Sequence, residues 1–211
     1  MCPPKAEKPI TRREFKDVIY SEERWRLLRV KRTKAIKILQ ILASIGIGGY
    51  VHGSIARGDV KPYSDIDIFI PFQVGEGVLI GVLETYGCSI YSREIVQATP
   101  HHVPKLLIAL DEETTIAIPL ADLHKTEREF YKFGGELDLN GLKDGKRVPG
   151  VDKRLMLIEP TAKGHRESSI IGREGEVARI LNIDVETVLE RVRVLTRRDS
   201  CLLYTSPSPR D

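Results

Sequence analysis

The sequence predicts an α/β (α+β) fold in which helices flank a small mixed β-sheet. Two observations lead to this fold class. Helical and strand-like patterns alternate through the first 130 residues, which is typical of mixed sheets covered by helices. The 211 residues are 41% hydrophobic and 30% charged, a composition typical of globular domains. We therefore expect one main domain over residues 15–130, followed by smaller units.

The first half of this domain reads as one helix and two strands. Residues 22–45 repeat apolar side chains at helical spacing between basic ones, which predicts an amphipathic helix. Glycines then precede a short strand at residues 50–52, and "IARGDV" (55–60) forms a helical turn or short helix. The apolar run at residues 65–71 predicts a buried strand.

The second half of the domain reads as a helix, a strand and a hairpin. Residues 76–86 predict a helix, although two glycines weaken the pattern. Residues 88–98 read as a strand. Residues 104–121 read as a hairpin that turns at "DEET" (111–114).

The character of the chain changes after residue 130. Residues 131–170 are rich in Gly, Lys and Asp, and form either an ordered β extension or a linker. Residues 171–199 show two short apolar helical faces separated by "NID" (182–184), with Asp184 as a candidate N-cap. Two helices joined in this way resemble a helix-turn-helix.

Residues 201–211, "CLLYTSPSPRD", do not continue the pattern of the preceding helix. They match, residue for residue, the translation of a sequencing-library transposon adapter. We therefore expect this segment to be an assembly artefact, and the natural protein to continue beyond Asp199 with other residues.

Composition also limits the class of protein. No apolar run approaches the roughly 20 residues of a membrane span, and the N-terminus lacks a signal-peptide pattern. These features predict a cytoplasmic protein without a membrane partner. The net charge of +3 permits a nucleic-acid or nucleotide partner without requiring one. The oligomeric state is left open by the sequence.

Two aspartates interrupt the apolar strand "SDIDIFI" (64–70). Residues two apart in a strand point to the same face, so Asp65 and Asp67 project together while Ile66 and Ile68 face the other side. Neighbouring carboxylates suit a hard cation such as Mg²⁺ or Mn²⁺. The alternative is an edge strand that carries charge against aggregation.

A candidate phosphate cradle precedes the aspartates. In "HGSIARGD" (52–59), Gly53 lets the backbone approach a ligand, and Ser54 begins a turn whose N–H groups attract phosphate. Arg57 adds a guanidinium group suited to phosphate oxygens. A phosphate cradle followed by a metal-binding pair of carboxylates is a more specific arrangement than either feature alone.

Together, "GSIARGDVKPYSDIDIFI" resembles the signature of the DNA polymerase β-type nucleotidyltransferase superfamily. The stretch from about residue 15 to 199, including "REFYKFGGELDL" and "GREGEVARIL", is similar to a family of predicted archaeal nucleotidyltransferases. The resemblance implies that Gly53, Ser54 and Arg57 bind a nucleoside triphosphate (NTP). It also implies that Asp65 and Asp67 are catalytic and hold two metal ions.

The sequence departs from the superfamily pattern at a third carboxylate. Active members usually place one on a later strand, but "TTIAIPL" offers Ala117 there. The possible substitutes are Glu94, Asp111, Glu112 and Glu113, and the sequence does not rank them.

The resemblance thus predicts a Mg²⁺-dependent enzyme that transfers a nucleoside monophosphate from an NTP to a hydroxyl group of RNA, DNA or protein and releases pyrophosphate. The alternative is a non-catalytic, antitoxin-like regulator on the same fold, which senses a nucleotide or binds DNA through the helix-turn-helix-like segment.

Overall fold

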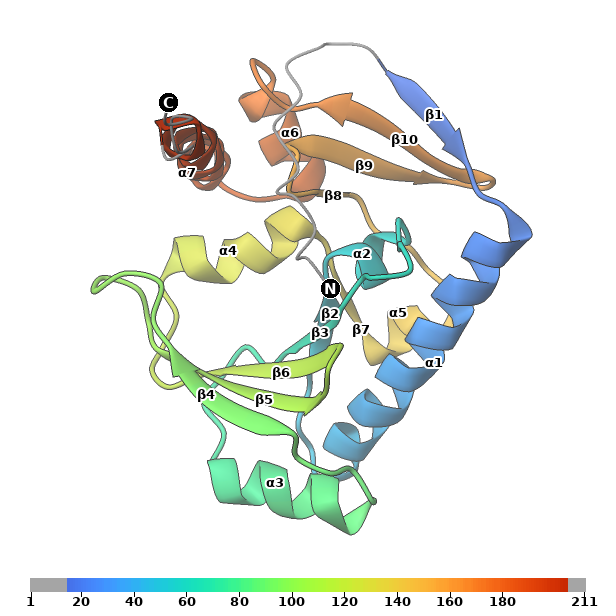
Figure 1. The fold of residues 1–211 in the computed structure, drawn as a ribbon, viewed down its shortest axis with the longest axis vertical. Helices are drawn as coiled ribbons and strands as arrows, with labels where there is room; N and C mark the ends of the chain where they lie inside the picture. Colours follow the sequence, from blue (N-terminus) through green and yellow to red (C-terminus); the bar gives the residue numbers. More distant parts are fainter. Residues whose placement is uncertain (1–14, 205–211) are drawn as a thin grey trace, which may run out of the picture.

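Two β-sheets organise the part of the chain that the structure describes, residues 15–204 of a computed structural model, with side chains described to residue 197 (Figure 1). In the first sheet the strand order is β4-β5-β6-β3-β2-β7. Neighbouring strands are antiparallel except β3 and β6, which are parallel. Its strands are β2 (Tyr50–His52), β3 (Ile66–Phe69), β4 (Ser92–Val96), β5 (Lys105–Asp111), β6 (Thr114–Pro119) and β7 (Glu136–Asp138). The mixed α/β fold class is thereby confirmed.

Helices α1 (Glu22–Ser44) and α3 (Glu76–Thr85) pack with one face of the first sheet in a shared core. Helix α1 begins where the Ser21 side chain accepts a hydrogen bond from the backbone N–H of Arg24 at 3.3 Å, as expected of an N-cap. Its apolar stripe, which includes Leu39 and Leu42, is buried. The helices predicted at 22–45 and 76–86 are therefore present.

The opposite face of the first sheet is partly covered by helix α4 (Lys125–Gly134) (Figure 1). The rings of Tyr131 on α4 and Phe69 on β3 stack with their centroids 3.4 Å apart. The ring of Phe133, two residues further along α4, is buried in a second core. Helix α4 thus contributes to both cores and joins the two halves of the molecule.

The second sheet has the order β1-β10-β9-β8, all antiparallel. Its strands are β1 (Lys16–Ile19), β8 (Gly150–Val151), β9 (Met156–Thr161) and β10 (Gly164–Ser169). Residues 131–170 therefore contain ordered β-structure, the first of the two readings left open by the sequence. The first sheet also continues past residue 130 through β7, which pairs with β2. Strand β1 was not predicted.

The remaining helices lie after α4. Helix α5 (Leu139–Lys143) begins where the Asp138 carboxylate accepts from the N–H of Gly141 at 2.8 Å. Helices α6 (Glu174–Leu181) and α7 (Val185–Tyr204) are separated by a turn in which Asn182 has a left-handed φ of 51°. Asp184 accepts a hydrogen bond from the N–H of Glu186.

The α6–α7 pair packs inward rather than standing free. Glu129 on α4 accepts hydrogen bonds from the hydroxyl of Thr187 and the N–H of Asp184. Helix α7 also continues to Tyr204, so the adapter-like segment starts as helix where a break was expected. The rest of that segment, residues 205–211, lies outside the described residues. Its origin as an artefact stays a prediction.

Candidate nucleotide and metal site

Asp65 and Asp67 lie at the start of β3 and are both solvent-exposed. Ile66 and Ile68, between and after them, are 0% and 1% exposed and belong to the core shared with α1. The alternation is therefore the predicted one, with the carboxylates on one face and the isoleucines on the other. Because β3 is a central strand, paired on both sides by β2 and β6, the edge-strand explanation does not apply to these charges.

The protein environment disfavours negative charge on Asp67. Although water reaches the side chain, the surrounding protein removes part of its hydration, which raises the pKa of Asp67 above its usual value. The neighbouring carboxylate of Asp65 raises this pKa further, whereas the ammonium group of Lys153 lowers it. A cation bound between the carboxylates would relieve the same repulsion.

The Gly53–Ser54 turn lies directly beside these aspartates. His52, the last residue of β2, pairs with Asp67 in the antiparallel ladder, so the turn that follows runs alongside the start of β3. Gly53 has a φ of 71°, which favours glycine, and its N–H donates to the carbonyl of Gly135 at 2.9 Å. The Ser54 hydroxyl makes no hydrogen bond within the described residues, so it is available to a ligand.

Arg57 was predicted to bind the nucleotide, and in the structure its guanidinium group is bound within the protein. The residue is 5% exposed, and its Nε and Nη2 donate to the two carboxylate oxygens of Asp59 at 2.9 Å each. Its Nη1 donates to the carbonyl oxygen of Gly134 at 2.6 Å and approaches that of Val151 at 3.4 Å. Sequence spacing could not reveal these acceptors, which lie 77 and 94 residues away.

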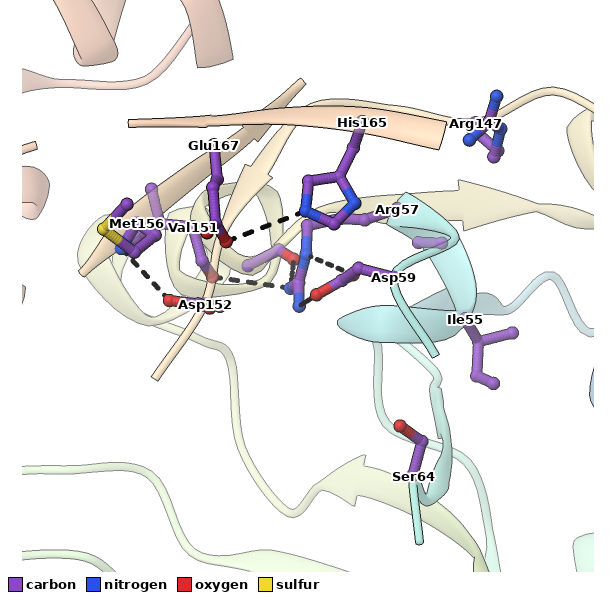
Figure 2. A network of polar contacts seen from close by, with 12 residues as sticks. Ile55, Arg57, Asp59, Ser64, Arg147, Val151, Asp152, Met156, His165 and Glu167 are labelled. Atoms are coloured by element: carbon purple, nitrogen blue, oxygen red, sulfur yellow. Dashed lines mark hydrogen bonds and ion pairs between the residues drawn. The ribbon is translucent and has the colours of Figure 1, made fainter. Parts of the chain in front are cut away.

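Figure 2 shows that Arg57 joins the α2 turn (Ser54–Arg57) to the second sheet. Around it, Asp152 and Glu167 both bind Arg154, at 2.7 and 2.8 Å. Asp152 also accepts from the N–H groups of Arg154 and Met156. These contacts fix the turn between β8 and β9, from which the exposed side chain of Lys153 projects.

The strand register identifies the neighbours of Asp67 in the sheet. On β6 the residue paired with Asp67 is Thr115, whereas Ala117 pairs with Phe69 beneath the Tyr131 ring. The position directly beside Asp67 is thus a threonine, two residues before Ala117 on the same strand.

The proposed substitutes for the third carboxylate lie elsewhere. Asp111 pairs with Lys34 of α1 at 2.7 Å, and Glu113 pairs with Lys31 of the same helix. Glu94 shares the face of Asp67, but it lies on β4, three strands from β3, or about 14 Å at the usual strand spacing. Glu112 lies in the exposed hairpin turn. Among the described residues, no group of three or more acidic, His or Cys side chains could hold a metal ion.

Sequence reasoning missed Glu136 on β7. The register places it beside His52 on the face of Asp67, two strands away. Its carboxylate is held by both terminal nitrogens of Arg128, at 2.5 and 2.8 Å. The segment "REFYKFGGELDL" contains both residues, but only the register shows that Glu136 faces the aspartates.

His52 is enclosed beside the aspartates and is neutral at pH 7. Burial, followed by the charge of Arg57, lowers the pKa of His52 to about 4. Its Nδ1 lies 3.2 Å from the carbonyl oxygen of Tyr131, so the neutral ring donates this proton to the backbone. His52 therefore cannot offset the charge of the two aspartates, which is consistent with a structural role.

One comparison with known proteins covers the segment that carries this site. Residues 32–112 match the family model described as "Nucleotidyltransferase domain". This segment includes the Gly53–Ser54 turn and both aspartates. For this segment, the match confirms the resemblance to the nucleotidyltransferase domain that the sequence indicated.

Two solved structures are also similar to this chain, both at 19% identity, a TM-score of 0.32 and 48% coverage of this chain. One is titled a GLD-2/RNP-8 complex and the other a non-canonical poly(A) polymerase complex, GLD-2–GLD-3. The chain covers 34% and 36% of those chains, about a third of their length. No curated protein matches the chain. None of the helices in residues 15–204 is long and apolar enough to cross a membrane.

Proposed function

We propose that the protein is a metal-dependent nucleotidyltransferase. It transfers a nucleoside monophosphate from an NTP to a hydroxyl group on RNA, DNA or protein, and it releases pyrophosphate. One observation carries the proposal: two exposed carboxylates on a central strand lie beside a Gly-Ser turn, within the segment that matches the nucleotidyltransferase family.

The carboxylates of Asp65 and Asp67 fit Mg²⁺ or Mn²⁺. Magnesium is usually held by one or two protein carboxylates, with substrate phosphates and water completing its oxygen shell. Asp65 and Asp67 supply these two protein carboxylates, and the repulsion between them favours a cation bound between them. When bound, the metal stabilises negative charge at the reacting phosphate.

The neighbouring side chains and backbone would orient the triphosphate. Within the described residues, the N–H groups of Ser54 and Ile55 meet no backbone acceptor, so they and the Ser54 hydroxyl can donate to phosphate oxygens. Lys153 adds a positive charge that already acts on Asp67. Arg57 acts as a positioning residue, because it holds the turn through Asp59 and the backbone rather than through the nucleotide.

The alternative of a DNA-binding regulator would use helices α6 and α7. In the structure, the guanidinium carbon of Arg191 on α7 lies 4.7 Å from the ring centroid of Phe130 on α4. Thr187 on the same helix is 1% exposed and bound to Glu129. This face of α7 therefore packs against α4, which favours a structural role for the helix over recognition of a DNA groove.

The proposal is tested with each NTP labelled at the α-phosphate, incubated with Mg²⁺ and total RNA. We expect transfer of label by the wild-type protein and a loss of at least about 100-fold in Asp65→Asn/Asp67→Asn, because the metal site is removed. Glu94→Gln, on the same sheet face but three strands away, is the matched control and should retain activity. Equal transfer by the double variant would overturn the role of these aspartates. No transfer, with sequence-selective DNA retention, would instead favour the regulator.

A further inference from the structure

Two negative charges and one positive charge meet at the candidate metal site. Besides burial, the pKa of Asp67 is shifted by the carboxylate of Asp65 and by the ammonium group of Lys153. The neighbours of Asp67 in the sheet carry no charge, since β6 places Thr115 there and β2 places the neutral ring of His52. The site therefore offers a cation two carboxylates and already faces one ammonium group.

Backbone packing holds Lys153 at this site. The carbonyl of Gly135 binds the candidate phosphate turn, and a Cβ added at Gly150 would lie 2.6 Å from the backbone nitrogen of Gly135. The start of β8 therefore lies directly on the segment that holds the turn. The next carbonyl along the chain, that of Val151, lies 3.4 Å from Nη1 of Arg57. Lys153 follows two residues later, and its exposed side chain makes no ion pair within the described residues.

A second divalent ion would lack protein ligands at this site. Two metal ions that share a site lie about 3.5–4 Å apart, so carboxylates around both of them have to offset their repulsion. Glu136 shares the sheet face, but it is two strands away and is bound by Arg128. Among the described residues, no group of three or more acidic, His or Cys side chains could hold a metal ion. The charge of Lys153 opposes a second ion further.

We propose that Asp65 and Asp67 hold one divalent cation, rather than the two that the resemblance implies, and that the ammonium group of Lys153 supplies the second positive charge for the triphosphate. The inference rests on the proposed function, because it concerns the same site. An ammonium group binds phosphate oxygens as a point charge, and unlike a metal ion it needs no carboxylate ligands. Lys153 thus neutralises phosphate charge beside a single metal ion.

The first test counts bound ions and does not depend on catalysis. Equilibrium dialysis measures Mn²⁺ bound per chain, alone and with the α,β-methylene analogues of the four NTPs, which cannot transfer a nucleotide. The wild type should hold one Mn²⁺ in both conditions. Without analogue, Asp65→Asn/Asp67→Asn should hold none.

A designed third carboxylate should change this count. The register places Thr115→Asp directly beside Asp67, so this variant should hold two Mn²⁺ ions with analogue bound. Thr161→Asp, at the end of β9 in the second sheet, adds the same charge elsewhere and should stay at one. Thermal unfolding shows whether Thr115→Asp is folded, and the wild-type count tests the proposal even where it is not.

The second test concerns the ammonium group. Lys153→Gln should bind Mn²⁺ about 5-fold more tightly at low salt, because a unit charge within about 10 Å opposes a divalent cation. The same variant should bind the analogues more weakly. Lys163→Gln, on the β9–β10 turn, is the matched control and should change neither affinity. A merely structural role of Lys153 would not shift the two affinities in opposite directions.

The possible outcomes separate this inference from the proposed function. Two Mn²⁺ ions per wild-type chain, or a single ion in folded Thr115→Asp, would overturn the inference. Unchanged affinities in Lys153→Gln would overturn the role of the ammonium group. A wild type that holds two ions and transfers the α-phosphate label retains the proposed function without this inference. Mn²⁺ binding that persists unchanged in Asp65→Asn/Asp67→Asn would contradict both.

Discussion

Replacing Arg57 by alanine should strongly destabilise the protein. Arg57 is 5% exposed and Asp59 is 9% exposed, so the substitution leaves a buried carboxylate without its counter-ion. It also removes the donor to the carbonyl of Gly134. Breaking a buried ion pair by removing one partner costs about 3–5 kcal/mol. This is a large share of the roughly 5–15 kcal/mol that stabilises a typical protein.

The loss is measured by thermal and urea unfolding of the wild type and Arg57→Ala. For a chain of this size, each kcal/mol shifts Tm by about 2–4 °C, so we expect Tm to fall by at least about 6 °C. The double variant Arg57→Leu/Asp59→Leu should recover part of the stability, because it removes the unpaired charge.

A conservative variant separates this structural role from nucleotide binding. Arg57→Lys keeps the charge but loses the two-pronged contact with Asp59, so it should unfold at lower temperature. Wild-type stability in Arg57→Lys, combined with a large rise in the Kd for NTP, would refute the assignment. Arg57 would then be a phosphate ligand, as the sequence first indicated.

Three further predictions concern other positions. Lys153→Gln should raise the KM for NTP by about 10-fold with little change in kcat, since a charged contact contributes about 1.5–3 kcal/mol. Lys163→Gln is the control and should leave KM unchanged. An unchanged KM in Lys153→Gln as well would contradict a contact between Lys153 and the nucleotide. Burial lowers the pKa of His165 below its usual 6.5, so the unfolded state binds more protons and stability is lost as pH falls below about 6.5. Tm should therefore decrease less between pH 7 and 5.5 in His165→Gln than in the wild type, and equal decreases would count against this. Gly150→Ala would place a Cβ 2.6 Å from a backbone nitrogen after α4 and should cost about 1–3 kcal/mol in urea unfolding. The control is Gly175→Ala on α6, where the new Cβ would meet nothing within 4 Å. It should be neutral or stabilise the protein by up to about 1 kcal/mol. A larger loss of stability in Gly175→Ala than in Gly150→Ala would contradict this packing.

Much of the first sheet could be predicted because its signals are local. The alternation of Asp65 and Asp67 with buried isoleucines sets the orientation of β3, and the glycine before Ser54 marks the turn. Helix α1 follows from a long apolar stripe with a serine cap. In each case the residues that determine the structure lie within one or two turns of the chain.

The rest depends on contacts between distant segments. Strand β1 forms only because β10, about 150 residues later, offers its edge. The role of Arg57 depends on carbonyl groups at Gly134 and Val151, and that of Glu136 on the register of β7 with β2. Glycine-rich and charged segments such as residues 131–170 carry little periodicity, so tertiary pairing decides their structure.

The most direct test of the proposed chemistry compares NTP labelled at the α-phosphate with NTP labelled at the γ-phosphate, under identical conditions with Mg²⁺ and the acceptor. Attack at the α-phosphorus predicts that the α-label becomes attached to the acceptor, while the γ-label is released as pyrophosphate. Both outcomes should be lost in Asp65→Asn/Asp67→Asn. Transfer of the γ-label to the acceptor, or release of the γ-label as inorganic phosphate without transfer, would contradict nucleotidyl transfer at this site.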